Sequence, residues 1–324
     1  TMNWSFMVVA MMPEHLLLIG IAVLIALDVL DVGQKYSALV AMAAVLGAAA
    51  MAALLAIVQF QGSPFPGHFS VDQATLTAKA VVLALTLPLL QLSRDEFGDD
   101  ERFYILLLSS LYGVLLVTSA DGFLTMFLGL EIMSMPVYVL VLLAYKRHEA
   151  AEAALKYLVL GGAATAMFLM GASLVYGATG SLALDAFVKA AQAKDTLAVV
   201  AVILVLVAFF LKAAVVPFHT WAPDAYEAAS VAVPAFMAIV IKAGVLLAVL
   251  RIVGMAPGDV KILRNAGARV TDDGLRTLVL ATYLLDVTRV LVVPHTRCKM
   301  VGTAEEDIHA MIAEKYGVDT YSME

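Results

Sequence analysis

Long apolar runs separated by short polar stretches make up the first 253 residues of the chain. Each run approaches or exceeds the length of about twenty residues that a helix needs to cross a bilayer. The eight runs lie near residues 13–30, 37–59, 74–92, 103–120, 122–144, 152–177, 197–215 and 229–253. The pattern predicts an all-α polytopic membrane protein with about eight transmembrane helices surrounded by lipid.

Proline interrupts the chain at the end of the seventh run. Residues 206–227 read LVAFFLKAAVVPFHTWAPDAYE, with Lys212 in the apolar part and Pro217 and Pro223 after it. Proline frees backbone carbonyl groups, and irregular backbone at membrane depth persists only where protein or water surrounds it. We therefore expect a broken seventh helix, a feature on which ion transporters build their sites.

Charged side chains within apolar runs are costly and indicate function by default. Glu131 lies deep in the fifth run and Lys242 lies in the middle of the eighth. Lys212 is near the end of its run, so its amine could instead extend to the interface. A lysine in apolar surroundings changes its proton affinity when a carboxylate approaches or withdraws. Lys212, His219 and Lys242 are therefore suited to a proton relay.

Other polar and small residues in these runs allow simpler interpretations. Lys156 follows Glu152 by four residues, so a surface ion pair on one helix face is an equal alternative to a functional role. For Lys79 we expect an interfacial position, and for the acidic stretch 95–101 a solvated connection. Small residues favour close helix contacts in membranes. In the sixth run they are Gly161, Gly162 and Gly171.

Three motifs resemble the antiporter-like subunits of respiratory complex I, and most closely the subunit N family of NADH-quinone oxidoreductases. They are a lysine followed by VPFH and WxPDxYE (212–227), GLExMSxP (129–136) and AxKYxxLG (154–161). The resemblance covers about residues 1–253 and implies a membrane subunit that takes part in proton translocation. It implies a proton path through Glu131, Lys156, Lys212, His219 and Lys242.

The same resemblance implies partner subunits and shows that this sequence matches only part of the family's length. Other subunits of such a complex bind NADH, flavin and iron–sulfur clusters, and we expect no cofactor on this chain, which has no GxGxxG loop before a helix and no set of cysteines. We expect other membrane subunits as its partners. The family carries two inverted repeats, and this sequence matches the first repeat and its leading helices.

Basic residues in the loops predict the orientation, because cytoplasmic loops are enriched in lysine and arginine. They follow the odd-numbered runs at Lys35, Arg94, Arg102, Lys146 and Arg147, whereas Lys189 and Lys194 follow the sixth. The excess places the odd loops in the cytoplasm. We expect a multi-pass protein of the inner membrane with its N-terminus and its C-terminal segment on the periplasmic side.

Composition agrees with a membrane protein and excludes some partners. Of the 324 residues, 62% are hydrophobic and 15% are charged, whereas soluble domains carry roughly a quarter charged residues. The mean hydropathy is +0.93. A net charge of -7 argues against nucleic acid as a partner.

The composition changes after residue 253, and we predict a second domain over residues 254–324. A Pro-Gly turn at 257–258 precedes an alternation of strands and helices. The expected elements are strands at 259–264 and 289–293 and helices at 274–285 and 304–315. This order is typical of a small α/β fragment.

The runs ILRNAGARVTDD (262–273) and LVVPHTRCKM (291–300) resemble the middle of β-carbonic anhydrases over residues 256–315. In that family the His and Cys of HxxC bind zinc, which implies His295 and Cys298 as ligands. The upstream CxDxR motif, which supplies the other groups, is missing. Two ligands are too few for a tetrahedral site, so we expect an incomplete site without stoichiometric zinc.

Two other functions stay open from the sequence. One is a CO₂-hydrating zinc enzyme coupled to a proton-conducting membrane domain. The other is an artificial join of two partial domains without activity. The leading interpretation is the membrane subunit of a proton-translocating NADH:quinone oxidoreductase.

Overall fold

A computed structural model describes residues 4–30, 36–144, 148–193 and 195–255, which all belong to one compact unit, Thr1–Pro257. Within these residues eight helical segments are long and apolar enough to cross a membrane. Seven are single helices, α2 (Met12–Val29), α3 (Ser37–Ile57), α4 (Gln73–Phe97), α5 (Glu101–Ser119), α6 (Phe123–Leu142), α7 (His148–Thr179) and α9 (Thr196–Ala213). The eighth joins α11 (Ala232–Phe236), a π-helical turn (Met237–Ile241) and α12 (Lys242–Ile252). The prediction of an eight-helix membrane protein is confirmed.

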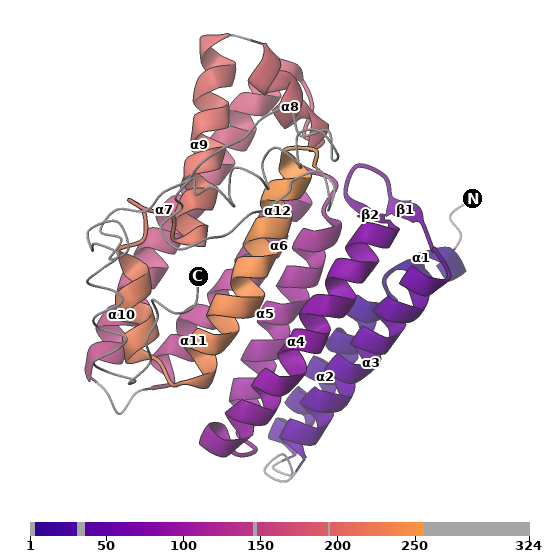
Figure 1. Cartoon of the computed structure of the whole chain (residues 1–324), viewed down its shortest axis with the longest axis vertical. Coiled ribbons are helices and arrows are strands. Elements are labelled where there is room, and N and C mark those ends of the chain that lie inside the picture. Colours follow the sequence, from indigo (N-terminus) through magenta and orange to yellow (C-terminus); the bar gives the residue numbers. More distant parts are fainter. Residues whose placement is uncertain (1–3, 31–35, 145–147, 194, 256–324) are drawn as a thin grey trace, which may run out of the picture. The chain divides into compact units, whose positions relative to one another are not determined.

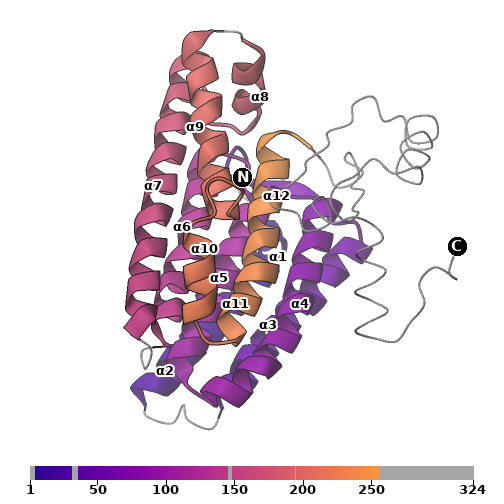
Figure 2. The ribbon, with the colours of Figure 1, turned by 60° about the vertical axis from the view of Figure 1, so that its left-hand side comes forward.

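Shorter elements connect these helices. They are α1 (Trp4–Ala10), the antiparallel strands β1 (Gly62–Phe65) and β2 (Phe69–Val71), α8 (Asp185–Gln192) and α10 (Trp221–Ala228). Helices α7 and α9 pair on one side of α5 and α6, and α2, α3 and α4 lie on the other (Figures 1 and 2). Helix α5 is the most buried of the spans, with 67% of its apolar window buried, and therefore forms the centre of the bundle.

Helix α4 extends beyond its apolar run, which ends near residue 92, to Phe97. Two of the acidic residues that follow this run bind the starts of other helices. The Glu96 carboxylate accepts a hydrogen bond from Ala232 N (3.3 Å) at the start of α11, and Asp99 accepts one from Ala38 N (3.1 Å) in α3. Unpaired N–H groups at helix starts favour such acceptors. Asp95 and Glu96 are exposed, as expected of a solvated connection, and the stretch has a capping role that was not expected.

The glycines of α7 differ in what they contact. A Cβ on Gly171 would lie 2.6 Å from Val205 Cγ2 of α9, and one on Gly161 would overlap the Tyr138 hydroxyl of α6. A Cβ on Gly162 would have no atom of the described residues within 4 Å. Close packing was therefore predicted correctly for Gly161 and Gly171 and wrongly for Gly162.

Lys79 is fully buried, so its predicted interfacial position was wrong. Its Nζ lies 2.5 Å from Glu14 Oε1, and both side chains are 0% exposed. The ammonium also lies 4.9 Å from the centre of the Phe69 ring in β2. The hairpin thus covers a buried ion pair that joins α2 to α4.

Candidate functional site

The predicted break in the seventh helix is present. Helix α9 ends at Ala213, and α10 begins only at Trp221, after a connection that contains Pro217. The last carbonyl groups of a helix lack partners within it. Trp221 Nε1 donates a hydrogen bond of 2.9 Å to one of them, Leu211 O. The indole therefore stabilises the irregular backbone directly beside Lys212.

Lys212 forms an ion pair with Glu131 across the helices α9 and α6. Lys212 Nζ lies 3.3 Å from Glu131 Oε1, and the two side chains are 6% and 15% exposed. The ammonium also donates to Ser134 Oγ at 3.3 Å. Thr165 of α7 donates a hydrogen bond to the same carboxylate oxygen, Oε1. Lys212 therefore points to a carboxylate inside the bundle and does not extend to the interface.

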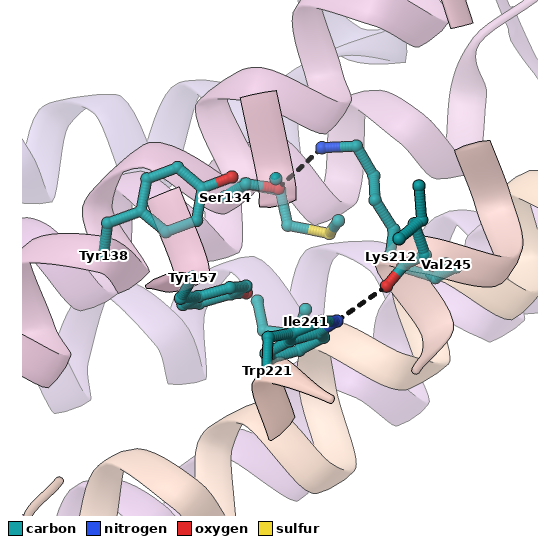
Figure 3. A pocket seen from close by; sticks show the side chains of 10 residues that line it. Ser134, Tyr138, Tyr157, Lys212, Trp221, Ile241 and Val245 are labelled. Carbon is teal, nitrogen blue, oxygen red and sulfur yellow. Dashed lines mark hydrogen bonds between the residues drawn. The ribbon is translucent and has the colours of Figure 1, made fainter. Parts of the chain in front are cut away.

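Three aromatic side chains, Tyr138, Tyr157 and Trp221, line a pocket together with Lys212 (Figure 3). Tyr157 stacks on Trp221 with ring centres 4.3 Å apart, and Tyr138 meets the edge of Tyr157 at 4.6 Å. Between these rings and Lys212 lies a cavity of about 10 Å³, which is about the room that one water molecule needs. Lys212 and Ser134 give such a water molecule polar partners in an otherwise apolar surrounding.

Lys156 lies in a different and more exposed place, with 47% of its side chain accessible. Its Nζ lies 2.7 Å from Glu152 of the same helix, as the surface alternative predicted, and 2.6 Å from Asp224 of α10. An open pocket of about 350 Å³ lies here, lined also by Glu149 and Glu227. Lys156 thus connects α7 to the segment after the helix break.

The other two predicted relay residues, His219 and Lys242, lie outside the Lys212–Glu131 pair. His219 is exposed in the connection between α9 and α10. Lys242 is half-buried and follows the π-helical turn, with its Nζ 5.6 Å from the centre of the Tyr226 ring of α10. Such π-helical turns are frequent at functional sites. The structure therefore brings Glu131 and Lys212 together and gives Lys242 an aromatic neighbour from α10.

The sequence did not indicate three of these partners. Ser134 follows Glu131 by three residues, so helical spacing could have placed it on the same face. Thr165 follows Gly161 by four residues and so shares its helix face. Gly161 faces α6, so Thr165 faces α6 as well. Asp224 carried a motif signal, but its pairing with Lys156 depends on how α10 packs.

The predicted zinc ligands, His295 and Cys298, lie outside the described residues. Within the described ranges, which end at residue 255, no group of three or more His, Cys, Asp and Glu side chains could hold a metal ion.

Residues 120–265 match the profile of a family described as NADH:quinone oxidoreductase/Mrp antiporter, TM. The NADH-quinone oxidoreductase subunit N of Pelobacter propionicus is 34% identical over 248 residues, covering 76% of this chain and 53% of that protein. The membrane part of this chain belongs to the antiporter-like subunit N family. The chain spans about half the length of the curated subunit N relatives it matches.

Solved structures show the same fold as the antiporter-like part. A chain of respiratory complex I from Thermus thermophilus, with bound aureothin, is similar with a TM-score of 0.66 and 32% identity, over 76% of this chain and 54% of that one. A chain of the Mrp complex from a Dietzia species shares the fold with a TM-score of 0.66 at 22% identity, over 79% of this chain and 50% of that one.

A second profile, that of carbonic anhydrase, matches residues 247–317. It overlaps the antiporter profile in residues 247–265. The match agrees with the resemblance of residues 256–315, all of which lie outside the described part of the chain. The antiporter-like subunit N family therefore accounts for the part that the structure describes.

Proposed function

We propose that this chain is a subunit-N-like membrane subunit of an NADH-quinone oxidoreductase and takes part in proton translocation. The observation that carries the proposal is the ion pair of Lys212 and Glu131 beside the broken helix, next to a cavity the size of one water molecule. A shielded lysine and carboxylate beside such a cavity can pass a proton between them without a separate cofactor.

In this proposal Lys212 holds the proton that is moved, and Glu131 sets its affinity by approaching or withdrawing. Lys156, His219 and Lys242 continue the path on either side of the helix break. Movement of α9 relative to α6 would change the distance between Lys212 and Glu131 and so drive the transfer.

The proposal extends to the surroundings of the chain. Other membrane subunits would flank it, and other subunits would hold NADH, flavin and iron–sulfur clusters. Its place would be the inner membrane, with the N-terminus and residues 254–324 on the periplasmic side. We place the domain boundary between residues 253 and 254.

A second candidate function is CO₂ hydration by the C-terminal part. The carbonic anhydrase profile over residues 247–317 is the observation in its favour. The sequence supplies His295 and Cys298 but no upstream CxDxR motif. This candidate therefore depends on whether the chain binds zinc at all.

The substitution Lys212→Ala tests the proton-translocation proposal. We expect proton movement in vesicles that contain the assembled complex to fall about a hundredfold, as for the loss of one proton-transfer group. A matched control is Lys189→Ala, since Lys189 pairs with Asp185 on the exposed face of α8. Full proton movement in the Lys212→Ala complex would exclude Lys212 from the path.

A further inference from the structure

The hydroxyl group of Thr165 lies between two acceptors. It donates to Glu131 Oε1 across the α6–α7 contact, and its oxygen also lies 3.1 Å from Gly161 O of its own helix. A threonine hydroxyl has one proton to donate and two lone pairs to accept with. Which of the two acceptors receives that proton therefore depends on whether Glu131 is ionised or protonated.

The hydrogen-bonding role of Glu131 changes when a proton moves from Lys212 to it. As a carboxylate it accepts hydrogen bonds only, and Thr165 then donates to it alongside Lys212. In the transfer an N–H bond of Lys212 breaks and an O–H bond forms on Glu131, which leaves a neutral amine and a neutral carboxylic acid. The new acid is a donor. Thr165 can accept from it and turn its own proton to Gly161 O.

Ser134 provides a lasting hydrogen-bond acceptor for Lys212. Its hydroxyl donates to Leu130 O at 2.7 Å, and its oxygen accepts from Lys212 Nζ at 3.3 Å. The ammonium therefore has an acceptor that does not depend on the charge of Glu131. Lys212 keeps a hydrogen bond when Glu131 is neutral or withdrawn.

We propose that Thr165 is a positioning residue that keeps Glu131 hydrogen-bonded both before and after it takes up a proton. The inference rests on the proposed function, in which Lys212 and Glu131 exchange a proton. A buried polar group that loses its partner is strongly disfavoured, so a hydroxyl that can reverse its direction makes both states of the pair accessible. The Gly161 carbonyl accepts the Thr165 hydroxyl proton when Glu131 is protonated.

Two substitutions at residue 165 separate the hydroxyl from the shape of the side chain. Thr165→Val removes the hydroxyl and keeps the branched shape, and Thr165→Ser keeps the hydroxyl. We expect proton movement by the assembled complex to fall about tenfold in Thr165→Val, as for loss of a hydrogen bond to a charged group. Thr165→Ser should restore it. The control is Thr86→Val, because buried Thr86 donates to Val82 O of its own helix, α4, and to no other group among the described residues.

Infrared spectroscopy on the purified chain in lipid tests the contact itself. The C=O stretch of the protonated Glu131 carboxyl group, recorded as the difference between acidic and neutral pH, is identified by its loss in Glu131→Gln. We expect this band to shift to higher frequency in Thr165→Val, because the acid loses its hydrogen-bond acceptor, and to stay in place in Thr165→Ser. An unshifted band in Thr165→Val, or equal effects of valine and serine, would overturn the proposal.

The two readouts also separate this inference from the function on which it rests. If Lys212→Ala leaves proton movement intact, the proposed function fails, whereas the infrared band still reports whether Thr165 binds Glu131. If Lys212→Ala abolishes proton movement and Thr165→Val does not change it, the proposed function stands and the role of Thr165 is wrong.

Discussion

Two lysines in apolar runs, Lys79 and Lys212, both pair with a glutamate but differ in access to water. The pair of Lys79 and Glu14 is fully enclosed, with both side chains 0% exposed. The pair of Lys212 and Glu131 adjoins a cavity and keeps 6% and 15% of its side chains exposed. A pair that exchanges protons needs a route to water, so we assign exchange to Lys212 and a structural role to Lys79.

Removing Lys79 alone should destabilise the protein. In Lys79→Met the Glu14 carboxylate would keep no partner, since its Oε2 already has none among the described residues. Breaking one partner of a buried pair costs about 3–5 kcal/mol. The double variant Glu14→Leu/Lys79→Met should recover most of this loss. Thermal unfolding in detergent measures both, and a single variant as stable as the parent would exclude the structural role.

At the residue scale, local sequence indicated the charged groups but not their neighbours. Glu131 and Lys212 stood out because charge is rare in apolar runs. Thr165 is 34 residues from Glu131, and Glu14 is 65 residues from Lys79. Such pairs depend on which helix faces meet in the bundle. A single sequence with local periodicity does not contain that information.

At the scale of the elements, the sequence predicted spans well and their ends less well. Span length and hydropathy are local properties, so all eight segments were found. The end of α4 was missed by five residues because its last turn is polar and binds α11 through Glu96. The β1–β2 hairpin, which is too short for a periodic pattern, was not predicted.

Two glycines of α7 should respond differently to the same substitution. Gly171→Ala would push a methyl group against Val205 of α9, and overpacking of this kind costs about 1–3 kcal/mol. Gly162→Ala meets open space and should stabilise the helix by up to about 1 kcal/mol. Denaturation in mixed micelles measures both. Equal effects of the two variants would contradict the packing of α7 on α9.

At the scale of the whole chain, two family profiles divide the sequence. The antiporter-like profile and the subunit N relatives cover the part that the structure describes, and the carbonic anhydrase profile covers residues 247–317. Both family resemblances were recognised from sequence motifs, because each family has a run of particular residues in a fixed order. Neither composition nor periodicity would have found the second one.

We predict that the purified protein holds no stoichiometric zinc and does not hydrate CO₂. A zinc site needs four ligands, or three and a water, and the carbonic-anhydrase-like motif supplies His295 and Cys298. Elemental analysis after removal of loosely bound metal measures the zinc content. One zinc per chain that disappears in Cys298→Ser would reverse this prediction and favour the enzyme candidate.

The most direct test of the central claim is a double-mutant cycle on Glu131 and Lys212, read out as the rate of proton movement by the assembled complex. If the two residues act as one acid–base pair, Glu131→Gln and Lys212→Met should each abolish most of the rate. The double variant should then lose little more than the worse single variant, because residues that act as a unit are non-additive. Losses that multiply in the double variant would show that Glu131 and Lys212 act independently and would contradict the account.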